Sequence, residues 1–129
     1  MHYTQMDVWQ QAVDLAVEIY ASTNGLPREE RFGLTSQMRS ASVSVPSNIA
    51  EGEGRRFRRD HARFILQARG SLYELDTQLV ICRRLGYIDV ETAEKLSQRV
   101  AKVGQLLHGT LRYLSRATNR EARSTPRSR

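Results

Sequence analysis

The stretch Ser44-Val45-Pro46-Ser47-Asn48-Ile49-Ala50-Glu51-Gly52, here called the proline segment, places a proline inside an apolar, helix-like pattern. A proline within a helix removes one backbone donor and presses its ring against the carbonyl four residues earlier, at a cost of about 3 kcal/mol. The residue before a proline is also biased away from helical geometry, so one alternative is a helix that stops near Val45. Because Ile49 continues the apolar stripe, we instead expect a kinked helix that ends at Gly52 or Gly54 in a left-handed glycine cap.

Four amphipathic segments surround and include the proline segment. Apolar residues recur in each at spacings of three and four, which is typical of helices that bury one face. The clearest run steps from residue 61 to residue 82 and forms a heptad seam. The predicted helices cover about residues 6–23, 34–52, 58–84 and 90–116. The stripes are Val8, Ala12, Leu15 and Ile19; Leu34, Met38, Ala41, Val45 and Ile49; His61, Ile65, Ala68, Leu72, Leu75, Leu79 and Cys82; and Ala93, Leu96, Val100, Val103, Leu107 and Leu114, widened by Leu106, Leu111 and Tyr113.

Short connections join these helices, with Gly86 as a stop signal and Asp89 as an expected N-cap. The sequence therefore predicts an all-α fold, an antiparallel up-down-up-down four-helix bundle that forms one domain over residues 1–117. Residues 118–129 are polar, contain Pro126 and lack periodicity. We expect them to form a disordered basic tail.

The 129-residue composition excludes several classes of protein. No apolar run approaches the about 20 residues that a membrane span needs, and no signal peptide is visible at the N-terminus. The one cysteine, Cys82, cannot form an internal disulfide, so a cytoplasmic location is expected. Its place on the apolar seam indicates a small core residue.

The net charge of +6 is unevenly distributed. Residues 112–129 hold six arginines against Glu121, a local charge of +5, whereas residues 1–111 hold fourteen basic and thirteen acidic groups, a charge of +1. Within the latter, residues 55–63 hold five arginines against Asp60, a local charge of +4. Two basic features therefore need explaining.

The candidate nucleic-acid-binding residues belong to these two features. Arginine suits bidentate contacts to phosphate, and Phe57 could stack on an unpaired base. The alternative is that the arginines are solvated and make salt bridges between subunits. The candidates are Arg55, Arg56, Arg58, Arg59, Arg63, Arg112, Arg116, Arg120 and Arg123.

Patterns typical of catalysis or metal binding are missing from the sequence. His61 and His108 lie on different predicted helices, and no paired metal-ligand spacing occurs. Gly52-Glu53-Gly54 follows a helix and lacks the strand and lysine of a phosphate-binding loop. We therefore assign no catalytic, cofactor-binding or metal-binding residues.

Several motifs in one register resemble the four-helix bundle proteins related to the 23S rRNA-intervening-sequence protein. The structural signature is Pro46, Asn48, Glu51 and Gly52 in the proline segment. The other matching residues are Val8-Trp9, Ala12, Leu15 and Tyr20; Pro27, Glu30, Phe32-Gly33-Leu34 and Gln37; Arg55-Arg56; and Gly70-Ser71 with Glu74-Leu75. The chain departs from the pattern at Phe57, where the family commonly has a capping Ser or Thr, and at His61, where it has an aromatic residue.

The resemblance implies a homopentamer that binds nucleic acid and has no enzymatic activity. The width of the apolar stripes independently suggests self-association, because one bundle cannot bury all of this surface. The leading hypothesis is a non-enzymatic, self-assembling bundle that binds RNA or DNA with little dependence on sequence. The alternative is an oligomeric scaffold or adaptor for another protein, as the resemblance to the accessory protein of diversity-generating retroelements suggests.

Overall fold

The computed structural model describes residues 2–124, with the backbone alone at residues 118 and 121–124. Two single 3-10 turns, η1 (Tyr3–Gln5) and η2 (Arg28–Glu30), accompany four long helices. These helices are α1 (Asp7–Thr23), α2 (Leu34–Glu53), α3 (Arg58–Arg84) and α4 (Val90–Ser124). The described chain contains no strand, which confirms the all-α prediction.

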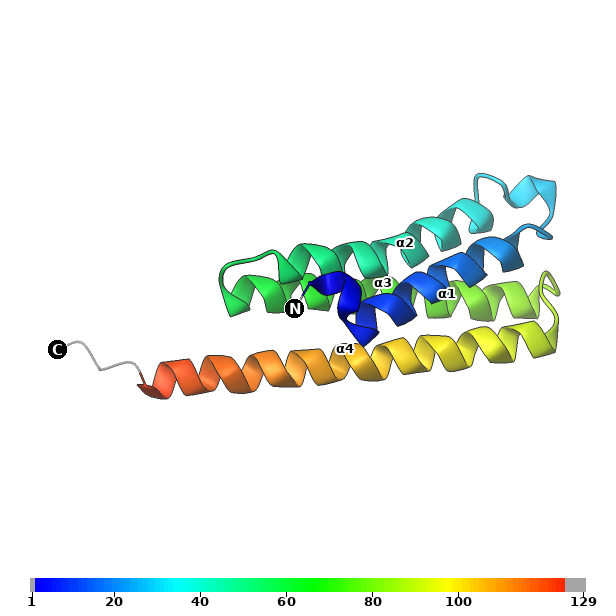
Figure 1. Cartoon of the computed structure of the whole chain (residues 1–129). Coiled ribbons are helices and arrows are strands. Elements are labelled where there is room, and N and C mark those ends of the chain that lie inside the picture. Colours follow the sequence, from blue (N-terminus) through cyan, green and yellow to red (C-terminus); the bar gives the residue numbers. More distant parts are fainter. Residues whose placement is uncertain (1, 125–129) are drawn as a thin grey trace.

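Successive helices run in opposite directions (Figure 1). Each helix packs against the next, and α1 also packs against α4, so that the four helices close into a ring. Within residues 2–124, the diagonal pairs α1 with α3 and α2 with α4 do not approach closely. This arrangement is the predicted antiparallel four-helix bundle.

The core lies where the four apolar stripes meet. All predicted stripe residues are buried except Leu34 and His61. The residues that were expected to widen the last stripe, Leu106, Leu111 and Tyr113, are not fully buried either. Cys82 is a core residue, as expected, with its Sγ 3.3 Å from Met38 Sδ. Burial raises the pKa of its thiol. No helix within residues 2–124 combines the length and the apolar character required to cross a bilayer.

Helix α2 passes through Pro46 without a break, so the alternative that it stops near Val45 is wrong. Polar side chains of the proline segment bind backbone groups locally. Ser47 Oγ donates to the Val43 carbonyl at 2.8 Å, and Asn48 Nδ2 donates to the Ser44 carbonyl at 2.9 Å. The kink at Pro46 stays a prediction.

The expected left-handed cap at Gly52 or Gly54 is wrong. Gly54 ends α2 with φ −78°, and Gly52 lies buried within the last turns of the helix. A Cβ at Gly52 would lie 2.9 Å from His61 Cδ2, 3.1 Å from the His61 carbonyl and 3.1 Å from Phe64 Cβ. Gly52 is therefore needed for the close packing of α2 on α3, and its backbone conformation is an ordinary helical one.

The turn between α3 and α4 forms as predicted. Gly86 has φ +75°, the Gly86 amide donates to the Arg83 carbonyl, and the Tyr87 amide donates to the Cys82 carbonyl at 2.9 Å. These contacts form a Schellman motif. Asp89 caps α4, because its Oδ1 accepts from the Thr92 amide at 2.7 Å, and this bond lowers the pKa of the Asp89 carboxyl.

Helix α4 is longer than predicted, since it ends at Ser124 and not near residue 116. Residues 118–124 of the expected disordered tail are thus helical, and residues 125–129 lie outside the described residues. Most of residues 117–124 are Ala, Arg or Glu, which are strong helix formers. A helix that is already nucleated adds a hydrogen bond with each residue and needs no apolar seam to continue.

Replacing Gly52 with alanine tests the packing of α2 on α3. We expect Gly52→Ala to lower the free energy of unfolding by about 1–3 kcal/mol, because overpacking outweighs the better helix propensity of alanine. The matched control is Gly70→Ala in α3, where a Cβ would meet nothing within 4 Å. This control should raise stability by about 0.5–1 kcal/mol. Urea denaturation at one protein concentration measures both changes, and equal stabilities of the two variants would contradict the prediction.

His61 is a buried ionisable group at the same contact. Its side chain is 15% exposed, and its buried Nε2 has no hydrogen-bond partner, with Glu53 Oε2 at 3.7 Å. Burial lowers the pKa of His61, and the nearby Glu53 carboxylate opposes that shift only in part. In the pH range between the lowered folded-state pKa and the unfolded-state pKa of about 6.5, the unfolded chain binds more protons than the folded chain.

Stability should therefore fall as the pH is lowered below about 6.5. We expect the thermal midpoint to drop between about pH 7.5 and pH 5.5, and the drop to shrink in His61→Phe, which cannot titrate. His108→Gln, which replaces an exposed histidine, provides the control for the loss of one imidazole. Scanning calorimetry across this range would contradict the prediction if the wild type and His61→Phe lost stability in parallel.

Candidate nucleic-acid interface

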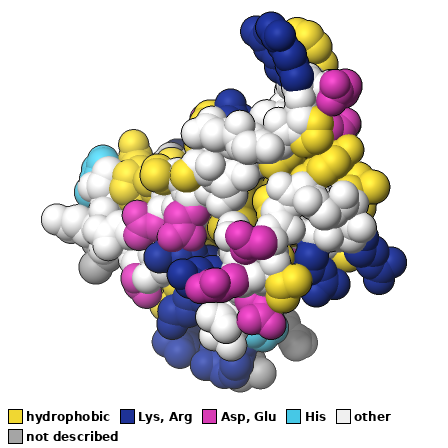
Figure 2. All heavy atoms as spheres, turned by 90° about the vertical axis from the view of Figure 1, so that its right-hand side faces the viewer, with side chains coloured by type: hydrophobic (Ala, Val, Ile, Leu, Met, Phe, Trp, Pro, Cys, Tyr) yellow, Lys and Arg dark blue, Asp and Glu magenta, His cyan; other side chains and the backbone are white. Residues whose placement is uncertain are grey.

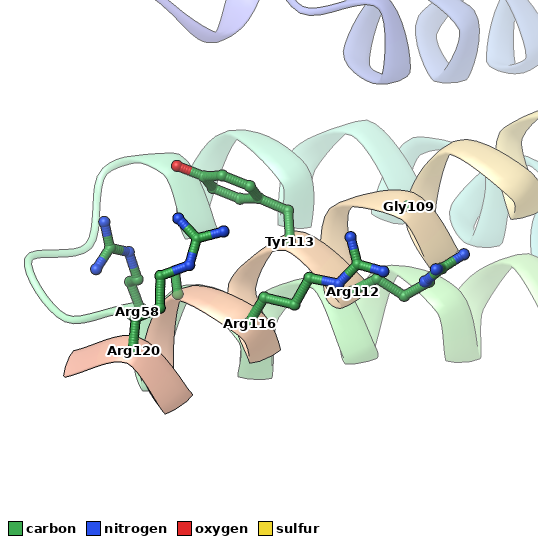
Figure 3. A pocket seen from close by; sticks show the side chains of 7 residues that line it. Arg58, Gly109, Arg112, Tyr113, Arg116 and Arg120 are labelled. Atoms are coloured by element: carbon green, nitrogen blue, oxygen red, sulfur yellow. The ribbon is translucent and has the colours of Figure 1, made fainter. Parts of the chain in front are cut away.

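Four arginines line one cleft where the start of α3 lies beside the C-terminal part of α4 (Figure 3). They line a cleft of about 590 Å³, here called the arginine cleft. Arg58 comes from the first turn of α3, and the other lining residues come from α4. The described residues that line it are Arg58, Gly109, Arg112, Tyr113, Arg116, Ala117 and Arg120.

Helical spacing and the packing of α3 on α4 explain why these arginines line one cleft. Arg112, Arg116 and Arg120 are four residues apart, so they lie on one face of α4 about 6 Å apart along its axis. Because α3 and α4 are antiparallel, the start of α3 lies beside the C-terminal part of α4 and brings Arg58 to the same cleft. In Figure 3, Arg58 and Arg120 extend on the same side as the Tyr113 ring, whereas Arg112 and Arg116 extend the other way along α4. The two basic features of the sequence thus meet in one site.

The described lining of the arginine cleft is rich in positive charge. Four of its seven described residues are arginines, and none of these seven is acidic. Arginine stays protonated in proteins, and each like-charged i, i+4 pair destabilises a helix by about 0.2–0.5 kcal/mol. Arg116 belongs to two such pairs, with Arg112 and with Arg120. An anion bound in the cleft would relieve this repulsion.

A second basic cleft lies between the same two helices. Its volume is about 650 Å³, and Arg112 lines it as well as the arginine cleft. We call it the lateral cleft. Its lining is Arg59, Ala62, Arg63, Leu66, Arg69, His108, Leu111, Arg112, Leu114, Ser115 and Asn119. The positive surface therefore continues from one cleft into the other.

The structure brings together six of the nine predicted arginines. Four of them line the arginine cleft, and Arg59 and Arg63 line the lateral cleft. Arg55 lies elsewhere, because it pairs with Glu51 Oε2 at 3.1 Å and its guanidinium covers the Phe64 ring at 4.5 Å. Arg56 lies over the Phe57 ring at 5.4 Å and lines neither cleft. The side chain of Arg123 lies outside the described residues.

Sequence reasoning missed several residues of these clefts. Tyr113 was placed on the widened apolar stripe, but it is 64% exposed and lines the arginine cleft. Arg69, His108 and Asn119 line the lateral cleft and had not been assigned to a site. The i, i+4 spacing of the α4 arginines was the available signal, whereas only the pairing of α3 with α4 could show which other side chains lie beside them.

The signature residues of the proline segment have structural roles. Pro46 and Gly52 are buried, Asn48 binds the Ser44 carbonyl, and Glu51 pairs with Arg55. Ser44 Oγ also lies 2.8 Å from Ser71 Oγ and links α2 to α3. These residues determine where α2 ends and α3 begins, and in this way they position Arg58.

An apolar groove lies on the other side of the bundle, over α1 and α2. It has a volume of about 500 Å³, and no charged residue lines it. Val17, Tyr20 and Val43 contribute exposed apolar surface to it. The complete lining of this groove is Tyr3, Trp9, Val13, Ala16, Val17, Tyr20, Val43, Pro46, Ser47 and Ala50.

The opposite end of the bundle differs in charge from the end with the arginine cleft. Acidic and basic side chains are intermixed on it (Figure 2). Arg28 and Glu29 of η2, and Arg84 and Asp89 at the α3–α4 turn, are exposed there. Among the described residues, no three His, Cys, Asp or Glu side chains are grouped so that they could hold a metal ion.

Comparison with known proteins finds a matching sequence family and a similar solved structure. A family model described as 23S rRNA-intervening sequence protein matches residues 4–109. The chain is also similar to a crystal structure of a Bacteroides thetaiotaomicron protein with unknown function from the S23 ribosomal protein family. That similarity has a TM-score of 0.73 at 22% identity, covers 81% of this chain and 97% of the other, and shows the fold alone. No curated protein matches the chain. The family match ends before Arg112, Arg116 and Arg120.

Proposed function

This chain belongs to the 23S rRNA-intervening sequence protein family, and we propose that it is a non-enzymatic, self-assembling bundle that binds RNA or DNA in the cytoplasm. The arginine cleft is the observation that carries the proposal. Guanidinium groups bind phosphate oxygens through paired, charge-assisted hydrogen bonds. A cleft lined by four arginines suits a phosphate backbone better than any neutral ligand.

The lining of the arginine cleft also favours binding that depends little on sequence. Contacts to phosphate position a protein on a nucleic acid but carry no base information. Base edges are read by Asn, Gln, Asp and Glu as well as by arginine, and none of those four residue types is among the described residues that line this cleft. Affinity would therefore come mainly from charge and would depend strongly on salt.

Self-assembly is supported by the apolar groove over α1 and α2. An uncharged groove with exposed Val17, Tyr20 and Val43 suits the apolar surface of a second copy. We take the homopentamer that the family resemblance implies as the proposed assembly. A pentamer in which α3 and α4 face outward would present five arginine clefts to one strand, which multiplies the avidity of individually weak sites.

The same groove supports a second candidate, an oligomeric scaffold or adaptor. An apolar helix of another protein could occupy the groove through side chains at i, i+3, i+4 and i+7. The arginine cleft would then bind an acidic surface of that protein. A pull-down beside a nucleic-acid panel separates the two candidates, because the adaptor should capture a defined protein and leave RNA and DNA unbound.

Replacing Arg116 tests the nucleic-acid proposal. If four arginines each contact a phosphate of a single strand, the slope of log affinity against log salt should be about −3 for each engaged protomer. Arg116→Gln should weaken binding by about fivefold or more and make the slope shallower by about 0.7. It should also raise the stability of the free protein at low salt by about 0.4–1 kcal/mol, because two like-charge pairs are removed.

Arg28→Gln removes the same charge at the opposite end of the bundle and serves as the control. We expect it to change neither the affinity nor the salt slope appreciably. Fluorescence anisotropy titrations between about 50 and 200 mM salt measure both quantities. Absence of binding at micromolar protein, or equal effects of the two substitutions, would contradict the proposal.

Introducing a charge into the apolar groove tests self-assembly. Val17 is 64% exposed in the groove, and Val90, outside it, is 65% exposed. Val17→Glu should reduce the mass measured by light scattering toward the 14.8 kDa of one chain, because a buried unpaired carboxylate is costly. Val90→Glu should leave the assembly intact. A wild-type protein that is monomeric at micromolar concentration would end this part of the proposal.

A further inference from the structure

We infer that the arginine cleft binds an unpaired single strand and that Tyr113 is the platform on which one of its bases stacks. This inference rests on the proposed function and specifies the form of nucleic acid that the site accepts. It also assigns a role to a residue that lies beyond the family match at residues 4–109.

The position of Tyr113 carries the inference. It is the one aromatic residue in the lining of the arginine cleft, and 64% of it is exposed although the cleft is formed between two packed helices. Its ring lies on the side toward which Arg58 and Arg120 extend (Figure 3). An exposed aromatic ring beside guanidinium groups is the combination by which proteins hold single strands, since the bases stack while the charges follow the backbone.

The arginines of α4 are arranged as a regular series. Arg112, Arg116 and Arg120 repeat about every 6 Å along the helix axis. An extended single strand presents its phosphates one after another at comparable intervals, so one strand can follow the helix and contact each arginine in turn. Tyr113 follows Arg112 directly in the chain, and its ring would reach a base on the inner side of that backbone.

A duplex does not fit this arrangement. Its bases are paired and stacked on each other, so they offer no free face to Tyr113. A helix that contacts base edges in B-form DNA enters the major groove, which is about 12 Å wide, whereas the major groove of duplex RNA is too narrow for side chains to read. Helix α4 cannot enter a major groove around Tyr113, because the neighbouring Leu114 is buried and Arg58 of α3 forms the other wall of the cleft.

Phe57 does not provide the same platform. It is 61% exposed, but Arg56 lies over its ring at 5.4 Å and it lines neither basic cleft. Tyr113 therefore takes the role that the sequence had suggested for Phe57. The reason is geometric, because a stacking ring must lie where the phosphates are held.

The experiment compares single-stranded and duplex RNA of equal length, and single-stranded DNA, by anisotropy with the full chain. Single strands should bind at least about tenfold more tightly than the duplex at the same salt concentration. Tyr113→Ala should weaken single-strand binding by about fivefold to a hundredfold, and Tyr113→Phe should restore it. The salt slope should stay unchanged in Tyr113→Ala, because no phosphate contact is lost. Tyr73→Ala is the matched control, since Tyr73 is 61% exposed on α3 outside both clefts.

A strand with abasic positions makes the test specific to stacking. The wild type and Tyr113→Ala should bind a fully abasic strand equally well, because it keeps the phosphates but has no base to stack. Equal binding of single strand and duplex, or equal affinities of Tyr113→Ala and Tyr73→Ala for the normal strand, would overturn the inference and leave the proposed function standing. Absence of binding to every RNA and DNA would overturn both.

Discussion

The close packing of α2 on α3 at Gly52 is the constraint on which the arrangement of this bundle depends. The missing side chain lets the His61 ring and the Phe64 Cβ approach the α2 backbone. A short connection then leads from Glu53 to Arg58, so α3 must begin beside the end of α2. Because α3 also packs along α4, this constraint decides where Arg58 lies relative to the arginines of α4. Through Gly52, the proline segment thus helps to position Arg58 in the candidate site.

The fold tolerates an unfavourable cluster of charge because the apolar core supplies far more stabilisation. Seven arginines in two adjoining clefts repel one another, and each like-charged helical pair costs only a few tenths of a kcal/mol. A single buried leucine contributes several times that amount. The core can therefore hold the backbone of the arginines in place without a bound anion. A site held in advance loses less conformational freedom when a ligand binds.

The two candidate surfaces use different helices, which allows both to be occupied together. The apolar groove is formed by residues of η1, α1 and α2, whereas the basic clefts are formed by α3 and α4. A helix seated in the apolar groove would not itself cover the arginines that line the basic clefts of the same chain. At the far end of the bundle, charges of both signs are intermixed (Figure 2). The two basic clefts therefore lie toward only one end of the molecule.

The sequence by itself determined the helices, the core and the charged residue types, because these depend on local periodicity and composition. It predicted the seam from Ile65 to Cys82, the turn at Gly86 and the cap at Asp89, all of which are local patterns. It misjudged Gly52 and Tyr113, since a glycine can serve a turn or a close contact, and a tyrosine can be buried or exposed. Only the tertiary structure decided between these roles. It also showed that Arg55 and Arg58 have different surroundings. Arg55 pairs with Glu51, four residues earlier, whereas Arg58 lines a cleft with three arginines more than fifty residues away in the chain. The physical reason is that antiparallel packing brings together residues that no sequence spacing relates.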